Sequence, residues 1–218
     1  MNVSEIRSAL ELGEFELQFR PRVALCDGRV DSLEAVLRWH HPRLGVLTPS
    51  AFSAEVESRA LGAELAWQIV ADALTAMRLW AGCGFVPRVW LPLPRNALAV
   101  RAHMADFAAL NGVDGGRLLC MDAPQVLTID AALVADAAES PNAEDKLALL
   151  LRKAHEAGMV TTAQGVSNLL DWLVLRELGC DYASGEFIAP HRLAHGVPDV
   201  LRIWREQHAA MSAVDQYL

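Results

Sequence analysis

The 218-residue chain contains few cysteines, and their spacing does not indicate a metal site. Cys26, Cys83, Cys120 and Cys180 lie far apart, and no two of them form a Cys-x-x-Cys pair. Such pairs are the usual signature of structural zinc, whereas disulfide frameworks belong mainly to small secreted chains with little core. The cysteine pattern therefore excludes the zinc-ribbon class and the disulfide-stapled class of protein.

The chain also lacks a long apolar run and an excess of basic residues. The most apolar long stretch, residues 61–81, is interrupted by Glu64, Asp72 and Arg78, so it is too polar to span a bilayer. Acidic residues outnumber basic ones by 27 to 19, for a net charge of −8, which disfavours binding to nucleic acid or to an anionic membrane. Residues 1–19 are acidic and amphipathic, unlike a signal peptide. We expect a cytoplasmic protein with neither nucleic-acid nor membrane partners.

The chain does contain enough apolar residues for one well-packed domain. Hydrophobic residues make up 53% of it, and no Ser/Gly linker divides it, so we expect a single domain over residues 1–218. The pattern predicts strands at about 15–23, 29–38, 85–91, 117–122, 159–163 and 180–183. It predicts helices at about 61–81, 96–110, 144–157 (with Asn142 as a possible N-cap), 169–178 and 198–208. This alternation is typical of an α/β fold with parallel strands joined by helices.

One stretch is more specific than the rest. Residues 33–39 read LEAVLRW, and HP at 41–42 and LTPSAF at 47–52 follow; LQFRP at 17–21 and GRV at 28–30 precede them. Together these segments resemble the opening of the EAL family, bacterial phosphodiesterases that hydrolyse cyclic di-GMP in a TIM-like barrel. Further along, TAQGVS at 162–167 is similar to the family's A-E-G-V-E segment, SGE at 184–186 to its Q-G-Y, and LTID at 127–130 to its K-I-D. The resemblance extends from about Phe15 to Leu193.

The resemblance implies a metal site whose ligands are mostly missing. The family's chemistry uses two divalent cations held by carboxylates and an amide at strand ends. Glu34 stands at the family's first glutamate position. At every other position this chain carries a different residue from the family. Trp90 replaces an asparagine, Met121, Pro124, Gln164 and Ser167 replace glutamates, Thr128 replaces a lysine, and Ser184 replaces a glutamine. An indole and a thioether are poor ligands for hard cations, and Asp122 points to the opposite face from Met121 if both lie on one strand. The resemblance therefore implies a chain that is not an enzyme and holds no metal or cofactor.

The resemblance also implies a shortened barrel. The family's D-D-F-G-T-G loop is absent, and residues 122–127 are too few for a crossover of roughly a dozen residues between parallel strands. We therefore expect an incomplete TIM-like (β/α) barrel of EAL type that lacks at least one βα unit. Residues 117–130 should form either one strand kinked at Pro124 or a tight antiparallel turn. The open flank predicts a protein partner, and a homodimer is one way to provide it.

Several residues keep two interpretations. Glu34 is either a relic of the metal site or a polar residue at a cavity mouth, and Trp90 is predicted to fill the former metal position. Arg20, Pro21 and Arg38 could bind a nucleotide, because guanidinium groups suit phosphate and the family's arginine after E-A-L contacts the dinucleotide. Arg38 could equally pair with a carboxylate such as Glu34. His40 and His41 are expected to serve in a loop rather than as a metal pair.

Two functions are therefore open. The first is an inactive EAL-like domain that acts in bacterial signalling or regulation through protein–protein contact. The second is a receptor that binds cyclic di-GMP without hydrolysing it. The retained Arg20, Pro21, Glu34 and Arg38 favour the receptor. Trp90, the lost loop and the negative net charge oppose it.

Overall fold

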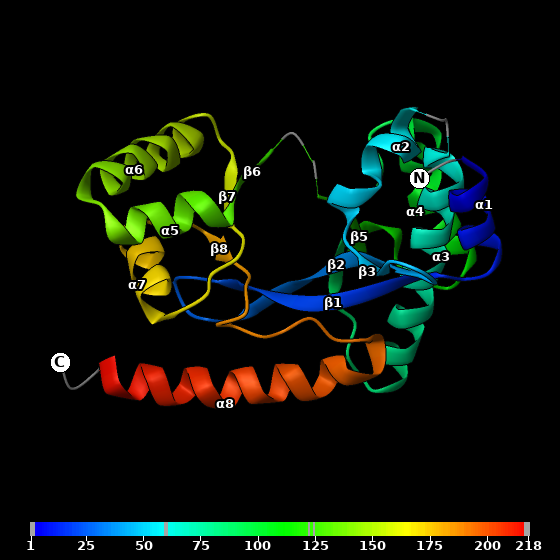
Figure 1. The fold of residues 1–218 in the computed structure, drawn as a ribbon. Helices are drawn as coiled ribbons and strands as arrows, with labels where there is room; N and C mark the ends of the chain where they lie inside the picture. Colours follow the sequence, from blue (N-terminus) through cyan, green and yellow to red (C-terminus); the bar gives the residue numbers. More distant parts are fainter. Residues whose placement is uncertain (1–2, 59–60, 122, 124, 216–218) are drawn as a thin grey trace. The chain divides into compact units, whose positions relative to one another are not determined.

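The computed structural model describes residues 3–58, 61–121, 123 and 125–215, and it separates into two compact units (Figure 1). Unit 1 comprises residues 1–19, 34–121 and 193–195, and unit 2 comprises residues 20–33, 122–192 and 196–218. The first two strands, β1 (Phe15–Ala24) and β2 (Val30–His41), contribute residues to both units. No helix in the described part of the chain is long and apolar enough to cross a membrane.

Unit 1 combines short strands with a long buried helix. Besides its parts of β1 and β2, it contains α1 (Val3–Glu11), β3 (Gly45–Leu47), η1 (Pro49–Ala51), α2 (Ser53–Ser58), α3 (Gly62–Gly82), β4 (Arg88–Leu91), α4 (Leu98–Leu110), η2 (Gly115–Arg117) and β5 (Leu118–Cys120). The strand order is β5-β4-β2-β1, and β3 pairs with β2 in antiparallel fashion. β4 and β5 run parallel, with α4 as the helical crossover between them.

The core of unit 1 follows from the two periodicities of its sequence. Along β2, Ala35, Leu37 and Trp39 are buried on one face, as alternation in a strand requires. α3 buries residues three or four positions apart, namely Leu65, Ile69, Ala73, Met77 and Trp80, so the helix predicted at 61–81 is confirmed. It ends at Gly82, where predicted, and α4 lies beside it (Figure 1).

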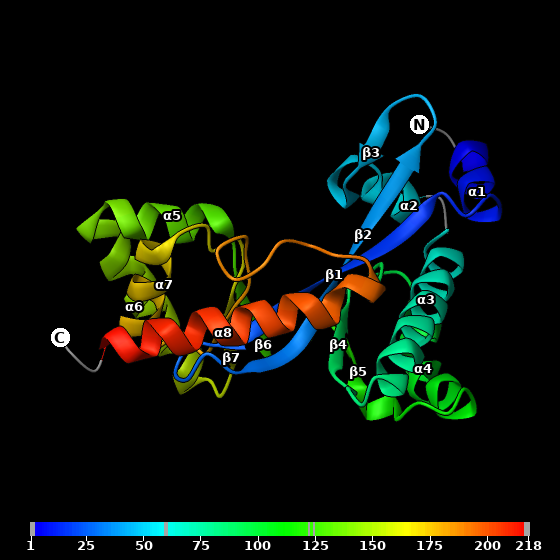
Figure 2. The ribbon, with the colours of Figure 1, turned by 90° about the horizontal axis from the view of Figure 1, so that it is seen from below.

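Unit 2 is built mainly from parallel strands and helices. It contains β6 (Val126–Ile129), α5 (Ala131–Glu139), α6 (Pro141–Glu156), β7 (Val160–Ala163), α7 (Leu169–Glu177), β8 (Tyr182–Ala183) and, after η3 (Ala194–Gly196), α8 (Val197–Asp215). The strand order is β1-β8-β7-β6, with β6, β7 and β8 parallel and β8 antiparallel to β1. α5 packs against α6 and α7 (Figure 2), and Ile129, Leu151, Trp172 and Trp204 belong to the shared core.

Several predicted boundaries differ from the structure. α6 begins at Pro141 with Ser140 as N-cap, so Asn142 lies inside the helix and is not its cap. Proline suits the first helical turn because the missing N–H would be unbonded there anyway. The strand predicted at 85–91 shortens to β4, and the one at 180–183 shortens to β8. The sequence prediction did not include α1, although residues 1–19 are amphipathic, nor α2, which has only six residues, nor α5.

Both expectations for residues 117–130 were wrong. The segment forms neither one kinked strand nor an antiparallel turn. Instead, β5 pairs in parallel with β4 in unit 1, and β6 pairs in parallel with β7 in unit 2. Each short strand therefore has its own partner, and the chain passes from one to the other without a helix among the residues described there. Asp122 and Pro124 lie outside the described residues, so their predicted roles stay predictions.

Candidate functional site

Glu34 lies on the face of β2 opposite the buried apolar residues. It is only 2% exposed, and the same face carries the half-buried Arg38 and the exposed His40. The Nη1 atom of Arg38 donates a hydrogen bond to the Leu37 carbonyl oxygen at 3.1 Å. This face of β2 therefore places the retained glutamate and the retained arginine in one row. The predicted pairing of Arg38 with Glu34 stays a prediction.

The expectation that His40 and His41 lie in a loop was wrong, because both residues end β2 and their side chains lie on opposite faces of it. The Nε2 atom of His40 lies 3.1 Å from the Glu16 carboxylate, whereas buried His41 lies 3.2 Å from Glu5. The strand continues to His41 because β3 pairs with it, residue His41 facing Gly45. The two imidazoles therefore have separate carboxylate partners and cannot share one ion.

Trp90 and Met121 occupy strand-end positions in unit 1. Trp90 is half-buried on β4 between the buried Val89 and Leu91, so its side chain lies on the other face of that strand. Met121 directly follows β5, and its backbone N–H donates to the Leu91 carbonyl oxygen at 3.2 Å. Neither side chain offers an oxygen to a hard cation. The predicted filling of the former metal position by Trp90 stays a prediction.

Gln164 and Ser184 are brought together at the carboxyl ends of β7 and β8. Because Ala163 faces Ala183 in the register, the next residue of each strand emerges beside the other. The Ser184 N–H donates to the Ala163 carbonyl oxygen at 2.9 Å, and Ser184 is fully buried while Gln164 is half-buried. Catalytic groups of parallel β/α barrels gather at this end of the strands. Here the two positions carry an amide and a hydroxyl.

Glycine lets the loops that follow these strands approach closely. A Cβ atom on Gly185 would lie 2.1 Å from the Val166 carbonyl oxygen, a distance that no real side chain tolerates. The Val166 N–H donates to the Ser184 carbonyl oxygen, and the Phe187 N–H donates back to Val166, both at 3.1 Å. The loops after β7 and β8 are therefore fixed to each other by backbone hydrogen bonds.

The other predicted positions of unit 2 lie on β1 and β6. Arg20 is half-buried and Pro21 is buried on β1, whereas Thr128 is exposed on β6 opposite Thr162 of β7. Sequence reasoning overlooked Arg22, whose buried guanidinium lies 4.0 Å from the centre of the Tyr182 ring. Such contact is favourable for a desolvated cation. The alternation of β1 was the signal that could have placed Arg20 and Arg22 on one face.

The acidic residues beside these strand ends are used to fix the backbone. Asp130 follows β6 directly, and its carboxylate accepts the Leu133 N–H at 3.0 Å as the N-cap of α5. Asp171 accepts both the N–H and the hydroxyl of Ser167 at 2.8 Å. Asn168 accepts the Asp171 N–H at 3.0 Å and caps α7. Ser167 is thus a partner of a structural carboxylate, a role that sequence reasoning did not foresee.

A second cluster lies at the opposite ends of β7 and β8. One Asp181 oxygen accepts the N–H and the hydroxyl of Thr161 at 2.8 Å, and it lies 3.0 Å from His155 Nε2. Burial works to raise the pKa of Asp181, but the hydrogen bonds from Thr161 and His155 outweigh it, so the pKa falls below its ordinary value of 3.8. Next to it, burial raises the pKa of the Cys180 thiol to about 11. The cluster joins two strands and a helix through one carboxylate.

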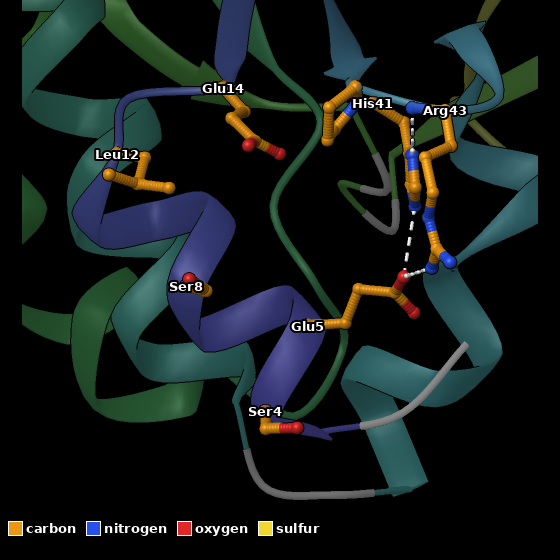
Figure 3. A pocket seen from close by; sticks show the side chains of 8 residues that line it. Ser4, Glu5, Ser8, Leu12, Glu14, His41 and Arg43 are labelled. Carbon is orange, nitrogen blue, oxygen red and sulfur yellow. Dashed lines mark hydrogen bonds and ion pairs between the residues drawn. The ribbon is translucent and has the colours of Figure 1, made fainter.

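Unit 1 also contains a pocket that involves none of the predicted site residues. It has a volume of about 470 Å³ and lies between α1 and the end of β2 (Figure 3). Glu5 accepts a hydrogen bond from Arg43 Nη2 at 2.8 Å, and the Arg43 N–H donates to His41 Nδ1 at 3.1 Å. Because Nδ1 accepts, the proton of the neutral ring is on Nε2, facing Glu5. Among the residues that the structure describes, no three His, Cys, Asp or Glu side chains form a group able to hold a metal ion.

Comparison with known proteins identifies the fold family. The model of the EAL domain matches residues 3–113 and 112–191. The chain belongs to the EAL domain family. The cyclic di-GMP phosphodiesterase RocR of Pseudomonas aeruginosa is 34% identical over 109 residues, which are 50% of this chain and 28% of RocR. The chain therefore spans less than a third of that relative's length.

Solved structures of EAL proteins share the fold. The Xanthomonas citri FimX EAL domain, solved in complex with c-diGMP, matches with a TM-score of 0.71 and 22% identity over 88% of this chain and 93% of that one. The PaMucR phosphodiesterase, solved as a c-di-GMP complex, matches with a TM-score of 0.69 and 20% identity over 89% and 98%. The predicted family and fold class are confirmed: an α/β, TIM-like barrel of EAL type in incomplete form.

Proposed function

We propose that this chain is a catalytically inactive EAL domain that acts in bacterial signalling or regulation through contact with another protein. The observation that carries the proposal is the chemistry of the family's ligand positions. Glu34 keeps a carboxylate, whereas the described residues Trp90, Met121, Thr128, Gln164 and Ser184 offer none. This chemistry is a property of the residue types, so it holds for any placement of the two units.

Nearby carboxylates are poor substitutes, because their oxygens already serve the fold. Asp130 caps α5, Asp171 holds the Ser167 backbone, and Asp181 holds Thr161. Turning such a carboxylate toward a metal would leave backbone N–H groups without their acceptor, at a cost of about 1 kcal/mol for a cap. A lone Glu34 cannot neutralise two dications. The residues present therefore do not fit the pair of hard cations that the family's chemistry requires.

Hydrolysis of cyclic di-GMP tests the absence of catalysis. The purified chain should release no product above the buffer blank with either Mg²⁺ or Mn²⁺, while RocR serves as the positive control under the same conditions. Metal-dependent turnover that disappears in Glu34→Gln would overturn the proposal. Turnover that survives Glu34→Gln would point to a contaminating enzyme, which a second purification route removes before the assay is repeated.

The two edge strands of the sheet, β5 and β6, support the proposal of a protein partner. β5 in unit 1 and β6 in unit 2 each have one paired neighbour among the described strands. Backbone groups along such an edge offer a template for a further strand, which natural proteins usually cover. A second copy of the chain is one candidate. Sedimentation velocity at increasing concentration should show a species larger than the monomer, and a monomer alone at high concentration would remove the homodimer.

A cyclic di-GMP receptor without hydrolysis is the second candidate. The FimX and PaMucR structures are complexes with this dinucleotide, and Arg20, Pro21 and Arg38 are retained here. Calorimetric titration separates the two candidates. Saturable heat that is lost in both Arg20→Ala and Arg38→Ala would favour the receptor, whereas no heat at tens of micromolar protein would discard it. Arg152→Ala, an exposed arginine of α6 outside every position named above, serves as the matched control.

A further inference from the structure

Unit 2 contains a pocket of about 430 Å³ between the turn that joins β1 to β2 and the helix α8. Its walls combine three basic side chains, Arg29, Arg205 and His208, with the single carboxylate of Asp27. The volume lies within the range of small-molecule sites, roughly 300–1,000 Å³. A basic pocket is unexpected on a chain with a net charge of −8. It also involves none of the residues on which the proposed function rests.

The walls of this pocket are fixed to each other. The Trp204 indole N–H, on α8, donates to the Gly28 carbonyl oxygen of the turn at 2.8 Å, and this contact is buried. The His208 ring lies 5.6 Å from the Trp204 ring and 6.2 Å from that of Trp172. These contacts hold the helix and the turn at one distance, so the backbone that carries the basic groups is in place before a ligand binds.

Gly28 lets the imidazole approach the turn. Its φ of +65° is a conformation that side chains disfavour, and a Cβ atom there would lie 2.0 Å from His208 Nε2. The glycine therefore serves two needs: the left-handed turn and the close packing of His208 against the backbone. Any side chain at this position would displace the ring from the pocket wall.

The charges of the pocket leave a positive surplus. Asp27 lies 3.4 Å from Arg29 Nε and accepts the Arg29 backbone N–H at 3.0 Å, so the pair is nearly neutral. Arg205 is exposed and makes no ion pair within the part of the chain that the structure describes. Its neighbour on the same helix, Arg202, is by contrast paired with Asp199 and Glu206. The surplus charge therefore rests on Arg205, with His208 beside it.

We propose that this pocket binds a small molecule through its phosphate group, with Arg205 as the principal ligand and Arg29 and His208 as its neighbours. A guanidinium donates two parallel hydrogen bonds to a phosphate, and an imidazole adds a third donor. The indole rings of Trp172 and Trp204 pack against the His208 ring at tilted and edge-on angles and support it. Gly28 leaves the space above its backbone to the His208 ring.

Titration calorimetry of the full chain in a phosphate-free buffer tests this site, with inorganic phosphate and pyrophosphate as probes and acetate at equal ionic strength as the carboxylate comparison. The wild type should show saturable binding that is stronger for the phosphates. Arg205→Glu should weaken it about tenfold or more, because one charge-assisted pair is lost and a repulsive charge is added. Arg202→Glu, on the same helix, should bind within about twofold of the wild type.

The fold of each variant is checked by circular dichroism, and both substituted side chains are exposed. Equal weakening in Arg202→Glu and Arg205→Glu would mean that general surface charge, not the pocket, attracts the anion. Acetate binding as strong as phosphate, or no saturable heat with any probe, would also overturn the proposal. Gly28→Ala provides a second route: it should lower phosphate affinity by displacing His208, and unchanged affinity would contradict the assigned wall.

Discussion

Several well-placed acidic side chains of the two units hold different kinds of partner. In unit 1, Glu14 accepts the Trp39 indole N–H at 2.8 Å, and Glu5 accepts from the Arg43 side chain. In unit 2, Asp130, Asp171 and Asp181 accept backbone N–H groups at the ends of strands and helices. Glu5 and Glu14 of unit 1 therefore hold side chains, whereas Asp130, Asp171 and Asp181 of unit 2 hold turns; Asp114 of unit 1 resembles the second group, because it accepts the Gly116 N–H at 3.0 Å. An acidic residue beside a strand end indicates a metal ligand only when the backbone has no use for its oxygens.

The largest expected loss of stability comes from replacing Trp39, whose indole N–H donates to Glu14 of unit 1. Trp39 is fully buried, with Phe15 at 5.2 Å and Phe52 at 5.7 Å between ring centres. Trp39→Ala should lower the free energy of unfolding by about 3–5 kcal/mol, because it leaves a large cavity and removes the donor that Glu14 accepts. Urea unfolding followed by circular dichroism measures the change.

A matched control is available in the same unit. Trp67 is 36% exposed, and its main ring contact is Phe107 at 5.0 Å. Trp67→Ala should therefore cost less than half of what Trp39→Ala costs. Equal losses would mean that burial of the indole does not set its contribution to stability.

The second prediction concerns Asp181, one of the carboxylates of unit 2 that accept a backbone N–H. Asp181→Asn keeps the size of the side chain but removes the charge that binds Thr161 and His155. We expect a loss of about 1–2 kcal/mol in the free energy of unfolding, since hydrogen bonds to a charged group are strong but this one is partly exposed and screened. Urea unfolding at neutral pH measures it, with Asp136→Asn, an exposed residue of α5, as control.

The pH dependence of this loss has a definite sign. The pKa of Asp181 in the folded chain lies below its ordinary value of 3.8. The ionised carboxylate therefore stabilises the fold above that ordinary value, and this contribution is lost as the pH falls through the lower, folded pKa. The difference between wild type and Asp181→Asn should be full at pH 6 and should shrink below about pH 4. If the difference in stability between the wild type and Asp181→Asn instead grew as the pH fell, the pKa of Asp181 could not be lowered in the folded chain.

Two helix N-caps, one with and one without a side-chain hydrogen bond, should differ by a smaller amount of stability. Asp130→Ala removes the side chain that accepts the Leu133 N–H and should cost about 1 kcal/mol. Ser140 also occupies an N-cap position, at the start of α6, but its side chain makes no cap hydrogen bond. Ser140→Ala should therefore be close to neutral. Equal effects in thermal unfolding would show that the cap hydrogen bond of Asp130 contributes nothing.

The strongly periodic parts of the fold could be predicted from the sequence. α3 was found because its apolar residues recur at helical spacing, and β1 and β2 because theirs alternate. α5 was missed because it follows β6 without an intervening loop, whereas α7, which is equally long, follows one. Asp130, an acidic residue just before an apolar run, was the available signal. The separate pairing of β5 and β6 could not be predicted, because three or four residues do not specify which neighbour they join.

The chemistry of the candidate site could be predicted better than its geometry. Which residue types occupy positions 34, 90, 121, 164 and 184 follows from the sequence alone, and the register of β7 and β8 then places Gln164 beside Ser184. The buried Arg22 was missed because its contact with Tyr182 joins strands far apart in the chain. The basic pocket beside α8 was missed for the same reason: Arg29 and Arg205 are neighbours only after folding.

The smallest expected effect comes from restoring one carboxylate to unit 2. Gln164→Glu places a glutamate at the carboxyl end of β7, beside the hydroxyl of Ser184 and in register with Asp130, whose carboxylate already caps α5. We expect its affinity for Mn²⁺ to stay within about twofold of the wild type, because one added carboxylate without oxygen-rich neighbours binds a hydrated dication weakly. Calorimetric titration with MnCl₂ measures it, and Gln125→Glu serves as control. Two tightly bound ions in Gln164→Glu would contradict the proposal that the remaining ligand positions are too poor in carboxylates to hold a pair of dications.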